Sequence, residues 1–201
     1  DPIPLELGYI NEKADAVLWI GAPGATGFNV VGKILSGEIN PSGRLPDIYP
    51  VDMTKDPTYN NFGRNSLEPT ETTAGGNQYT VGGQHVSAYF TDYEEGIYIG
   101  YRYYETMAVE VADENANWYN ENVVYPFGAG QSYSDFSWEI EDVRTIQGSA
   151  ITGNERVKVD VKVTNNGNYA GKDVVQLYYT APYSETSNLE KSHVVLGDFA
   201  K

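Results

Sequence analysis

Hydrophobic and polar positions alternate with a period of two along the aromatic stretch from Tyr93 to Glu105. A period of two in residues that are mostly aromatic or β-branched predicts an extended strand rather than a helix. The glycines within it lack side chains, which would let another backbone or a ligand approach closely. We expect this strand to link a βα unit before it to an all-β unit after it. The alternating positions are Ile97, Ile99, Tyr101 and Tyr103 on one face and Tyr98, Gly100, Arg102 and Tyr104 on the other.

The first forty residues predict one strand–turn–helix unit. Ala14–Ile20 is an apolar run with a single acidic interruption, which indicates a buried strand of a parallel sheet. Apolar residues then recur at helical spacing over Thr26–Ser36, and Gly37 stands where a helix commonly ends. Because one βα unit cannot bury both faces of its strand, we expect residues 1–50 to be the end of a larger α/β sandwich domain.

Residues 51–133 are predicted to form a long irregular excursion that includes the tyrosine-rich linking strand. Positions 51–92 are polar, carry paired asparagines and glycines, and show little apolar periodicity. Loops of this length are commonly functional or disordered. Positions 111–122 are also polar and predicted to be a loop. Aromatic rings and amides in the excursion have the chemistry to line a sugar site. The alternative is that they only anchor the loop to the rest of the protein. These side chains belong to Tyr59, Asn60, Asn61, Phe62 and Tyr79.

Short alternating segments in the last third of the chain predict β-strands at the spacing of an immunoglobulin-type β-sandwich. The dipeptide Asn166–Gly167 predicts a hairpin turn. Four strands are fewer than the roughly seven of a complete sandwich, so residues 134–201 are predicted to form a partial one. We therefore expect the chain to be truncated at both ends. The predicted strands are Phe136–Val143, Val157–Val163, Val174–Tyr179 and Ser192–Phe199.

The charge balance of the chain is strongly acidic, with 28 acidic residues against 13 basic ones and a net charge of −15. Nucleic acids and anionic membranes are polyanions, so neither is an expected partner. There are no cysteines, which excludes disulfides and thiolate metal sites. No apolar run approaches the roughly 20 residues of a membrane span, and the first residues lack the pattern of a signal peptide. We expect a soluble protein, and this composition fits both the bacterial cytoplasm and secretion.

Two features that resemble ligand sites are predicted to be structural. The glycines of Gly21–Gly27 have the spacing G-x-x-G-x-x-G, and Pro23 removes one of the amides that a phosphate cradle needs. His85 and His193 lie far apart without acidic residues at ligand spacing. The sequence therefore predicts no cofactor and no metal ion.

Five motifs follow one another in a fixed order outside residues 51–92. They are Trp19–Gly24 (WIGAPG), Asn40–Pro46 (NPSGRLP), Tyr93–Tyr104 (YEEGIYIGYRYY), Tyr125–Tyr133 (YPFGAGQSY), and Val161–Thr164 with Gly171–Tyr178 (GKDVVQLY). Together they resemble the C-terminal part of glycoside hydrolase family 3, the β-glucosidase family. The resemblance implies an α/β plus all-β fold, in which the first motifs end an α/β sandwich domain and the later ones open a fibronectin-type-III-like (Ig-like) β-sandwich.

The resemblance also implies an activity, that of a retaining exo-acting β-glycosidase whose substrate is a β-linked oligosaccharide or glucoside. In this family the nucleophilic Asp lies in a separate barrel domain with a Ser-Asp-Trp-type motif, which this sequence lacks. The acid/base Glu lies upstream of the Pro-Gly turn and would precede residue 1. We therefore predict no catalytic residue in this chain, and the missing barrel domain as its partner. The residues predicted to be substrate-proximal are Tyr59, Asn60, Tyr93 and Glu94.

Glu94 and Glu95 are adjacent carboxylates, but they do not suit a catalytic pair. Neighbouring residues on a strand point to opposite faces, whereas the two carboxyl groups of a retaining glycosidase lie about 5–5.5 Å apart. Arg102 is predicted to form an ion pair with Glu105 or Asp92 and to stack on a neighbouring ring.

Two other functions fit the same patterns. The chain would be a carbohydrate-binding or adhesion module if Tyr98, Tyr101 and Tyr103 lined an open face as stacking platforms. It would be a scaffold if it packed only against protein partners. Burial of the three tyrosines distinguishes the platform from the enzyme fragment.

Overall fold

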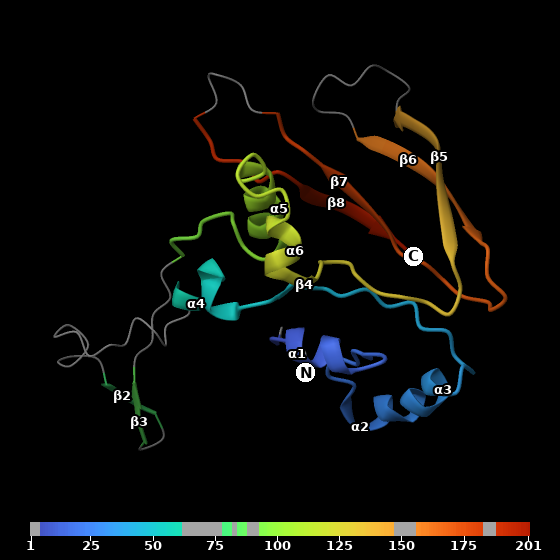
Figure 1. The fold of residues 1–201 in the computed structure, drawn as a ribbon, viewed down its shortest axis with the longest axis horizontal. Helices are drawn as coiled ribbons and strands as arrows, with labels where there is room; N and C mark the ends of the chain where they lie inside the picture. The colour runs from blue at the N-terminus through green and yellow to red at the C-terminus, as the bar shows by residue number, and fades with distance from the viewer. Residues whose placement is uncertain (1–4, 62–77, 82–83, 88–92, 147–155, 183–187) are drawn as a thin grey trace. The chain divides into compact units, whose positions relative to one another are not determined.

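The computed structural model describes residues 5–61, 78–81, 84–87, 93–146, 156–182 and 188–201 (Figure 1). The chain has a mixed α/β structure with short helices and small two-stranded sheets. It divides into two compact units, and each unit takes its segments from distant parts of the sequence. The first unit comprises Asp1–Gly21, Leu45–Ala129 and Leu177–Asp198, and the second comprises Ala22–Arg44, Gly130–Gln176 and Phe199–Lys201.

The first unit has a small core of Ile48, Tyr104 and Val123, each at most 7% exposed. Helix α5 supplies Tyr104, and β4 supplies Val123. Strand β1 pairs antiparallel with β4, and β2 with β3. The elements of this unit are α1 (Gly8–Lys13), β1 (Tyr49–Pro50), the 3₁₀ helix η2 (Met53–Lys55), α4 (Pro57–Asn61), β2 (Gln78–Val81), β3 (Gln84–Ser87), α5 (Tyr101–Glu110), α6 (Trp118–Asn122) and β4 (Val123–Tyr125), with most of β7 (Val175–Tyr179) and β8 (Val195–Ala200).

The strand predicted through the tyrosine-rich stretch is wrong, because this stretch forms a turn followed by helix α5. Gly96 and Gly100 both have φ of +57°, a backbone conformation that favours glycine, and Gly100 precedes the first residue of the helix. Tyr101 and Tyr104 are spaced three residues apart, which places them on neighbouring positions of one helix face. The Tyr101 ring stacks on Phe127 with centroids 4.6 Å apart. Tertiary packing of the rings therefore outweighs their preference for strands.

The predicted N-terminal strand is also wrong, whereas the helix after it is confirmed. Residues 14–20 pair with no strand in the described parts of the chain, and Trp19 is 39% exposed. A lone extended segment has no ladder of hydrogen bonds, which a parallel strand requires. Helical turns run from Gly24 to Leu35 as α2 (Gly24–Gly27), η1 (Phe28–Val30) and α3 (Val31–Leu35) in the second unit. Gly37 has φ of +79°, and its N–H donates to the carbonyl of Ile34 at 3.0 Å, which confirms it as the residue that ends this helix.

The four predicted β-strands are confirmed as β5 (Phe136–Thr145), β6 (Val157–Asn165), β7 and β8. The hairpin at Asn166–Gly167 is wrong. Strand β6 pairs antiparallel with β5, and β7 pairs with β8, so this turn joins strands of different sheets. The Asn166 N–H instead donates to the carbonyl of Asp135 at 2.8 Å. A Cβ on Gly167 would lie 2.7 Å from Ser134 Cβ, so close approach to Ser134 requires glycine there.

Sheet β5–β6 has one apolar and one charged face. Trp138 lies opposite Val163, and Val143 opposite Val159, so these side chains share a face. The charged face carries Arg144, which forms ion pairs with Asp142 and Asp160. This alternation is the pattern from which the strands were predicted.

Two side chains of the NPSGRLP motif hold the second unit together. The Asn40 amide donates to the carbonyl of Ala170 at 3.2 Å, and its oxygen accepts from Ser132 Oγ at 2.7 Å and from the Tyr133 N–H at 2.8 Å. Arg44 forms an ion pair with Asp173. The motif therefore joins an early segment to two segments more than 90 residues later in the chain.

Across the parts of the chain that the structure describes, no helix has both the length and the apolar character needed to cross a membrane. Within the same residues, no three or more His, Asp or Glu side chains gather as they would around a metal ion.

Candidate functional site

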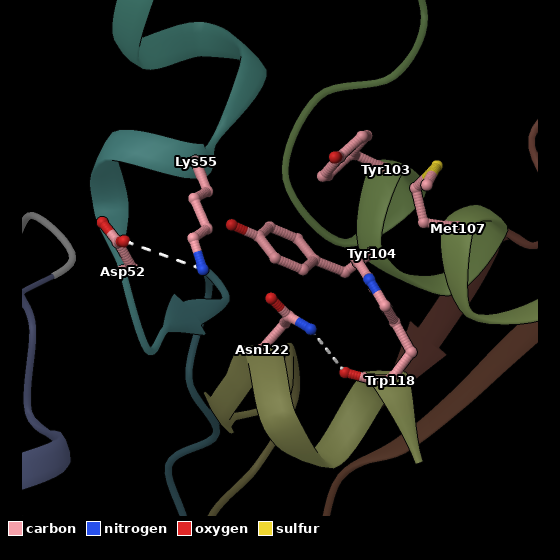
Figure 2. A pocket seen from close by; sticks show the side chains of 7 residues that line it. All are labelled: Asp52, Lys55, Tyr103, Tyr104, Met107, Trp118 and Asn122. Carbon is pink, nitrogen blue, oxygen red and sulfur yellow. Dashed lines mark hydrogen bonds and ion pairs between the residues drawn. The ribbon is translucent and has the colours of Figure 1, made fainter. Parts of the chain in front are cut away.

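A pocket of about 250 Å³ opens in the first unit beside helix α5 (Figure 2). Three short elements supply its walls: η2 with the residue before it, α5, and α6. The lining combines a carboxylate, an ammonium group and an amide with three aromatic rings and a thioether. The lining residues are Asp52, Lys55, Tyr103, Tyr104, Met107, Trp118 and Asn122.

Asp52 is fixed by capping the 3₁₀ helix that follows it. Its carboxylate accepts from the Thr54 N–H at 2.9 Å and from Thr54 Oγ1 at 2.6 Å. These hydrogen bonds lower the pKa of Asp52, so the group is a carboxylate at neutral pH. Lys55 Nζ lies 4.0 Å from the second carboxylate oxygen, and the Lys55 side chain is 71% exposed. The wall at η2 therefore presents an ion pair of which the cation remains open to solvent.

Tyr104 is the most buried residue of the pocket, with 2% of its surface exposed. Its ring centroid lies 5.1 Å from that of Tyr103 and 6.1 Å from that of Trp118. Figure 2 shows the Tyr104 ring pointing from α5 toward Lys55. The Asp56 carboxylate lies beside the Tyr104 hydroxyl, within reach of a hydrogen bond from it. Burial first, and then Asp56, raise the pKa of Tyr104 far above that of a free tyrosine.

Asn122 closes the pocket at the end of α6. Its amide nitrogen donates to the Trp118 carbonyl at 2.7 Å. Figure 2 shows the amide oxygen on the side of Asn122 that faces Lys55 and Tyr104. This oxygen is a hydrogen-bond acceptor within the pocket.

The pKa values of two tyrosines of the first unit predict an alkaline loss of stability. Burial raises the pKa of both Tyr104 and Tyr119 above the unfolded value of 10.0, and Tyr119 also donates to Glu105 at 2.7 Å. Below pH 10 both rings are neutral in either state. Above pH 10 they ionise first in the unfolded chain, so the free energy of unfolding falls as the pH rises. Urea unfolding at about pH 9, 10 and 11 measures this. The Tyr119→Phe variant should lose less stability over this range, and an equal loss would contradict the assignment.

The residues predicted to be substrate-proximal do not line this pocket where they are described. Tyr59 is 41% exposed within α4, and the side chain of Asn60 lies outside the described residues. Tyr93 is 70% exposed, and Glu94 is exposed in the turn at residues 94–97. Asn61, Phe62 and Tyr79 have side chains outside the described residues, so their proposed sugar contacts stay predictions. The sequence analysis did not identify Asp52, Lys55, Trp118 and Asn122 as pocket residues. Trp118 and Asn122 are four residues apart, a spacing that places side chains on one face of a helix and could have indicated α6.

The prediction for Arg102 is confirmed for the neighbouring ring, and its alternative ion pair with Asp92 stays a prediction. Glu105 accepts from Tyr119, and no ion pair between Arg102 and Glu105 forms in the described structure, while Asp92 lies outside it. The Arg102 guanidinium carbon lies 6.0 Å from the centroid of the Tyr101 ring, so the predicted contact with a neighbouring ring is present. The side chain of His85 lies outside the description. The His193 N–H donates to Thr106 Oγ1 at 2.9 Å beside a smaller pocket of about 140 Å³.

Comparisons with known proteins assign the chain to a family of sugar hydrolases. Residues 2–101 match the glycosyl hydrolase family 3 C-terminal domain. A beta-glucosidase of Ruminococcus albus is 32% identical over 198 residues, and thermostable beta-glucosidase B of Acetivibrio thermocellus is 31% identical over 188 residues. The chain belongs to glycoside hydrolase family 3.

The match covers nearly all of this chain but a small part of each relative. The alignments include 98% and 94% of the chain, yet 16% and 20% of the two relatives. The structure of beta-glucosidase 3B from Thermotoga neapolitana in complex with alpha-D-glucose is 28% identical with a TM-score of 0.69. That alignment covers 98% of this chain and 22% of the other. The chain thus spans about a fifth, or less, of the proteins it matches.

Proposed function

We propose that the chain is a non-catalytic portion of a retaining exo-acting β-glycosidase, of β-glucosidase type, that hydrolyses terminal β-linked sugars. The observation that carries this proposal is the alignment of 98% of the chain with a beta-glucosidase. Residues 1–50 would end an α/β sandwich domain, and residues 134–201 would form part of a fibronectin-type-III-like sandwich. Residues 51–133 would link these two domains. The substrate would be a β-linked oligosaccharide or glucoside. The protein partner of the chain would be a barrel domain of the same enzyme.

The carboxylates of the chain support a non-catalytic role. A retaining glycosidase needs one carboxyl group with a raised pKa as its acid and a second as its nucleophile. Asp52 is the one carboxylate among the residues that line the main pocket, and its pKa is lowered. Glu94 is exposed in a turn. Neither arrangement supplies the acid that the reaction requires.

The test is an assay of the purified 201-residue chain on aryl β-glucosides. We expect no turnover above the buffer rate, while a complete family 3 β-glucosidase assayed in parallel releases the aryl group. The Glu94→Gln and Glu95→Gln variants serve as controls for contaminating activity, because an activity that belongs to the chain would change in one of them. Turnover by the chain that disappears in either variant would overturn the proposal.

The packing of the tyrosines does not favour the alternative of a binding module with open aromatic platforms. Tyr101 stacks on Phe127, and its hydroxyl accepts from the Leu196 N–H at 2.9 Å. Tyr103 packs against the core, and its ring forms a T-shaped pair with that of Tyr104. Rings fixed in this way pack within the first unit, so Tyr101 and Tyr103 do not favour an open stacking platform.

A further inference from the structure

We propose that the dipeptide Asn166–Gly167 is a site of spontaneous deamidation, and that the hydrogen bonds of the folded turn keep it closed. The two residues lie in the second unit, directly after the last residue of β6. Both are exposed, so access of water does not limit the reaction. The inference rests on the geometry of this turn and is independent of the proposed enzyme function.

Deamidation of an asparagine starts with the backbone nitrogen of the residue that follows it. This nitrogen loses its proton and attacks the side-chain amide carbon, so that a new C–N bond forms while the Cγ–Nδ2 bond breaks and ammonia leaves. Water then opens the cyclic succinimide at either carbonyl and leaves aspartate or isoaspartate. Glycine is the most permissive following residue because it has no side chain to hinder the attack. Asn166 is the one asparagine of the sequence that precedes a glycine.

Packing explains why this reactive pair stands here. A Cβ on Gly167 would lie 2.7 Å from Ser134 Cβ and 2.8 Å from Ser134 Cα, so the close approach of the two residues requires glycine. Asn166 donates from Nδ2 to Ser137 Oγ at 3.0 Å and from its N–H to the Asp135 carbonyl at 2.8 Å. Both residues of the pair therefore have a structural role in joining the end of β6 to the start of β5.

The same turn occupies both groups that must react. The Gly167 N–H, whose nitrogen is the nucleophile, donates to Asn165 Oδ1 at 2.9 Å. Asn166 Nδ2, the leaving group, is held by Ser137 Oγ. Asn165 is itself fixed, because its Nδ2 donates to the Tyr169 carbonyl at 2.8 Å. At least one of these hydrogen bonds has to break before the nitrogen can attack, so deamidation proceeds from a locally opened turn.

The products of the reaction would weaken the turn that formed them. Aspartate at position 166 has no amide hydrogen to donate to Ser137 Oγ. Isoaspartate adds a carbon to the backbone, which shifts the N–H that bonds to the Asp135 carbonyl. The affected position is the end of sheet β5–β6, where Phe136 lies opposite Asn165. We therefore expect deamidation to lower the stability of the second unit.

The experiment is incubation of the folded 201-residue chain at mildly alkaline pH, followed by mass spectrometry of the tryptic peptide Val163–Lys172. The same chain unfolded in guanidinium chloride is the reference. We expect Asn166 to react at least about tenfold more slowly in the folded chain, because one or more hydrogen bonds must break first. Equal rates in the two states, or no reaction at Asn166 in the unfolded chain, would overturn the proposal.

Two variants at one position test whether the hydrogen bond to Gly167 closes the site. Asn165→Ala removes the acceptor of the Gly167 N–H, so the rate in the folded chain should rise about fivefold. Asn165→Asp is the matched control, because it keeps an acceptor oxygen and should leave the rate low. Both variants lose the donor to Tyr169, so a difference between them reports on the acceptor. In guanidinium chloride, Asn165→Ala should react at the rate of the wild type.

A third variant keeps the proposal testable if Asn165→Ala fails to fold. Ser137→Ala removes the acceptor of Asn166 Nδ2 at an exposed position and should raise the rate in the folded chain about threefold. Circular dichroism checks that each variant is folded. An unchanged rate in the folded variants that lose an acceptor, or an equal rise in Asn165→Ala and Asn165→Asp, would show that these hydrogen bonds do not protect Asn166.

Discussion

Replacement of Asp173 by alanine is expected to lower the free energy of unfolding by about 3–5 kcal/mol, the typical effect of removing one partner of a buried ion pair. The Asp173 side chain is 3% exposed. It accepts hydrogen bonds from Arg44, from Trp138 Nε1 at 2.8 Å and from the Val174 N–H at 2.9 Å. Alanine would leave the Arg44 guanidinium, whose side chain is 16% exposed, without its counter-charge.

Urea denaturation of the wild type and the variant measures this loss. Asp160→Ala is the matched control, because Asp160 also pairs with an arginine, Arg144, but is 34% exposed. Exposed ion pairs contribute little to stability, so the control should change little. Equal losses in the two variants would show that burial does not set the strength of the Asp173 pair.

Replacement of Asn40 by alanine is expected to cost about 2–3 kcal/mol. The side chain makes three hydrogen bonds, each worth roughly 1 kcal/mol, with Ala170, Ser132 and Tyr133. In a chain of this length the loss corresponds to a fall in Tm of roughly 4–12 °C. Differential scanning calorimetry measures it.

Asn120→Ala provides the comparison for that measurement. Asn120 is exposed on α6, and its amide donates to Asn117 Oδ1 at 2.9 Å. A surface substitution of this kind changes stability by about 0.5 kcal/mol or less. If Asn40→Ala cost no more than Asn120→Ala, the hydrogen bonds of Asn40 would not hold the second unit together.

The sequence correctly predicted those helices and strands that are determined by residues close together in the chain. Strands β5 and β6 follow from the alternation that puts Trp138 and Val159 on one face and Arg144 on the other. The end of the helical run of residues 24–35 follows from Gly37, which adopts a positive φ. In each case neighbouring residues suffice to determine the backbone, so periodicity and glycine placement were informative.

The tyrosine-rich stretch shows where local patterns fail. Tyr101 and Tyr104 fit a strand by composition and a helix by spacing. Contacts with distant residues decide between them: Tyr101 stacks on Phe127, and its hydroxyl accepts from Leu196. The positive φ of Gly100 then sets the start of the helix. Sequence alone contains neither contact, so it predicted the strand.

The pocket could not be predicted from the sequence for a related reason. Its walls come from three short segments, and Asp52 and Asn122 stand 70 positions apart. The burial of Tyr104 is a property of packing and has no sequence pattern. The residues predicted to be substrate-proximal lie outside this pocket where they are described, and their role stays a prediction.

The ion pair between Arg44 and Asp173 also has a consequence for the order in which the protein assembles on the ribosome. The two residues are 129 positions apart. At a translation rate of about 5–20 residues per second, Arg44 is made roughly 6–26 s before its partner. During this interval the helical run of residues 24–35, with Phe28 59% and Leu35 71% exposed even in the folded chain, has none of the contacts that Asn40 and Arg44 later make. The contacts of Asn40 and Arg44 with Ala170 and Asp173 can therefore form only after residue 173 has been made, and the nascent chain must stay soluble without them.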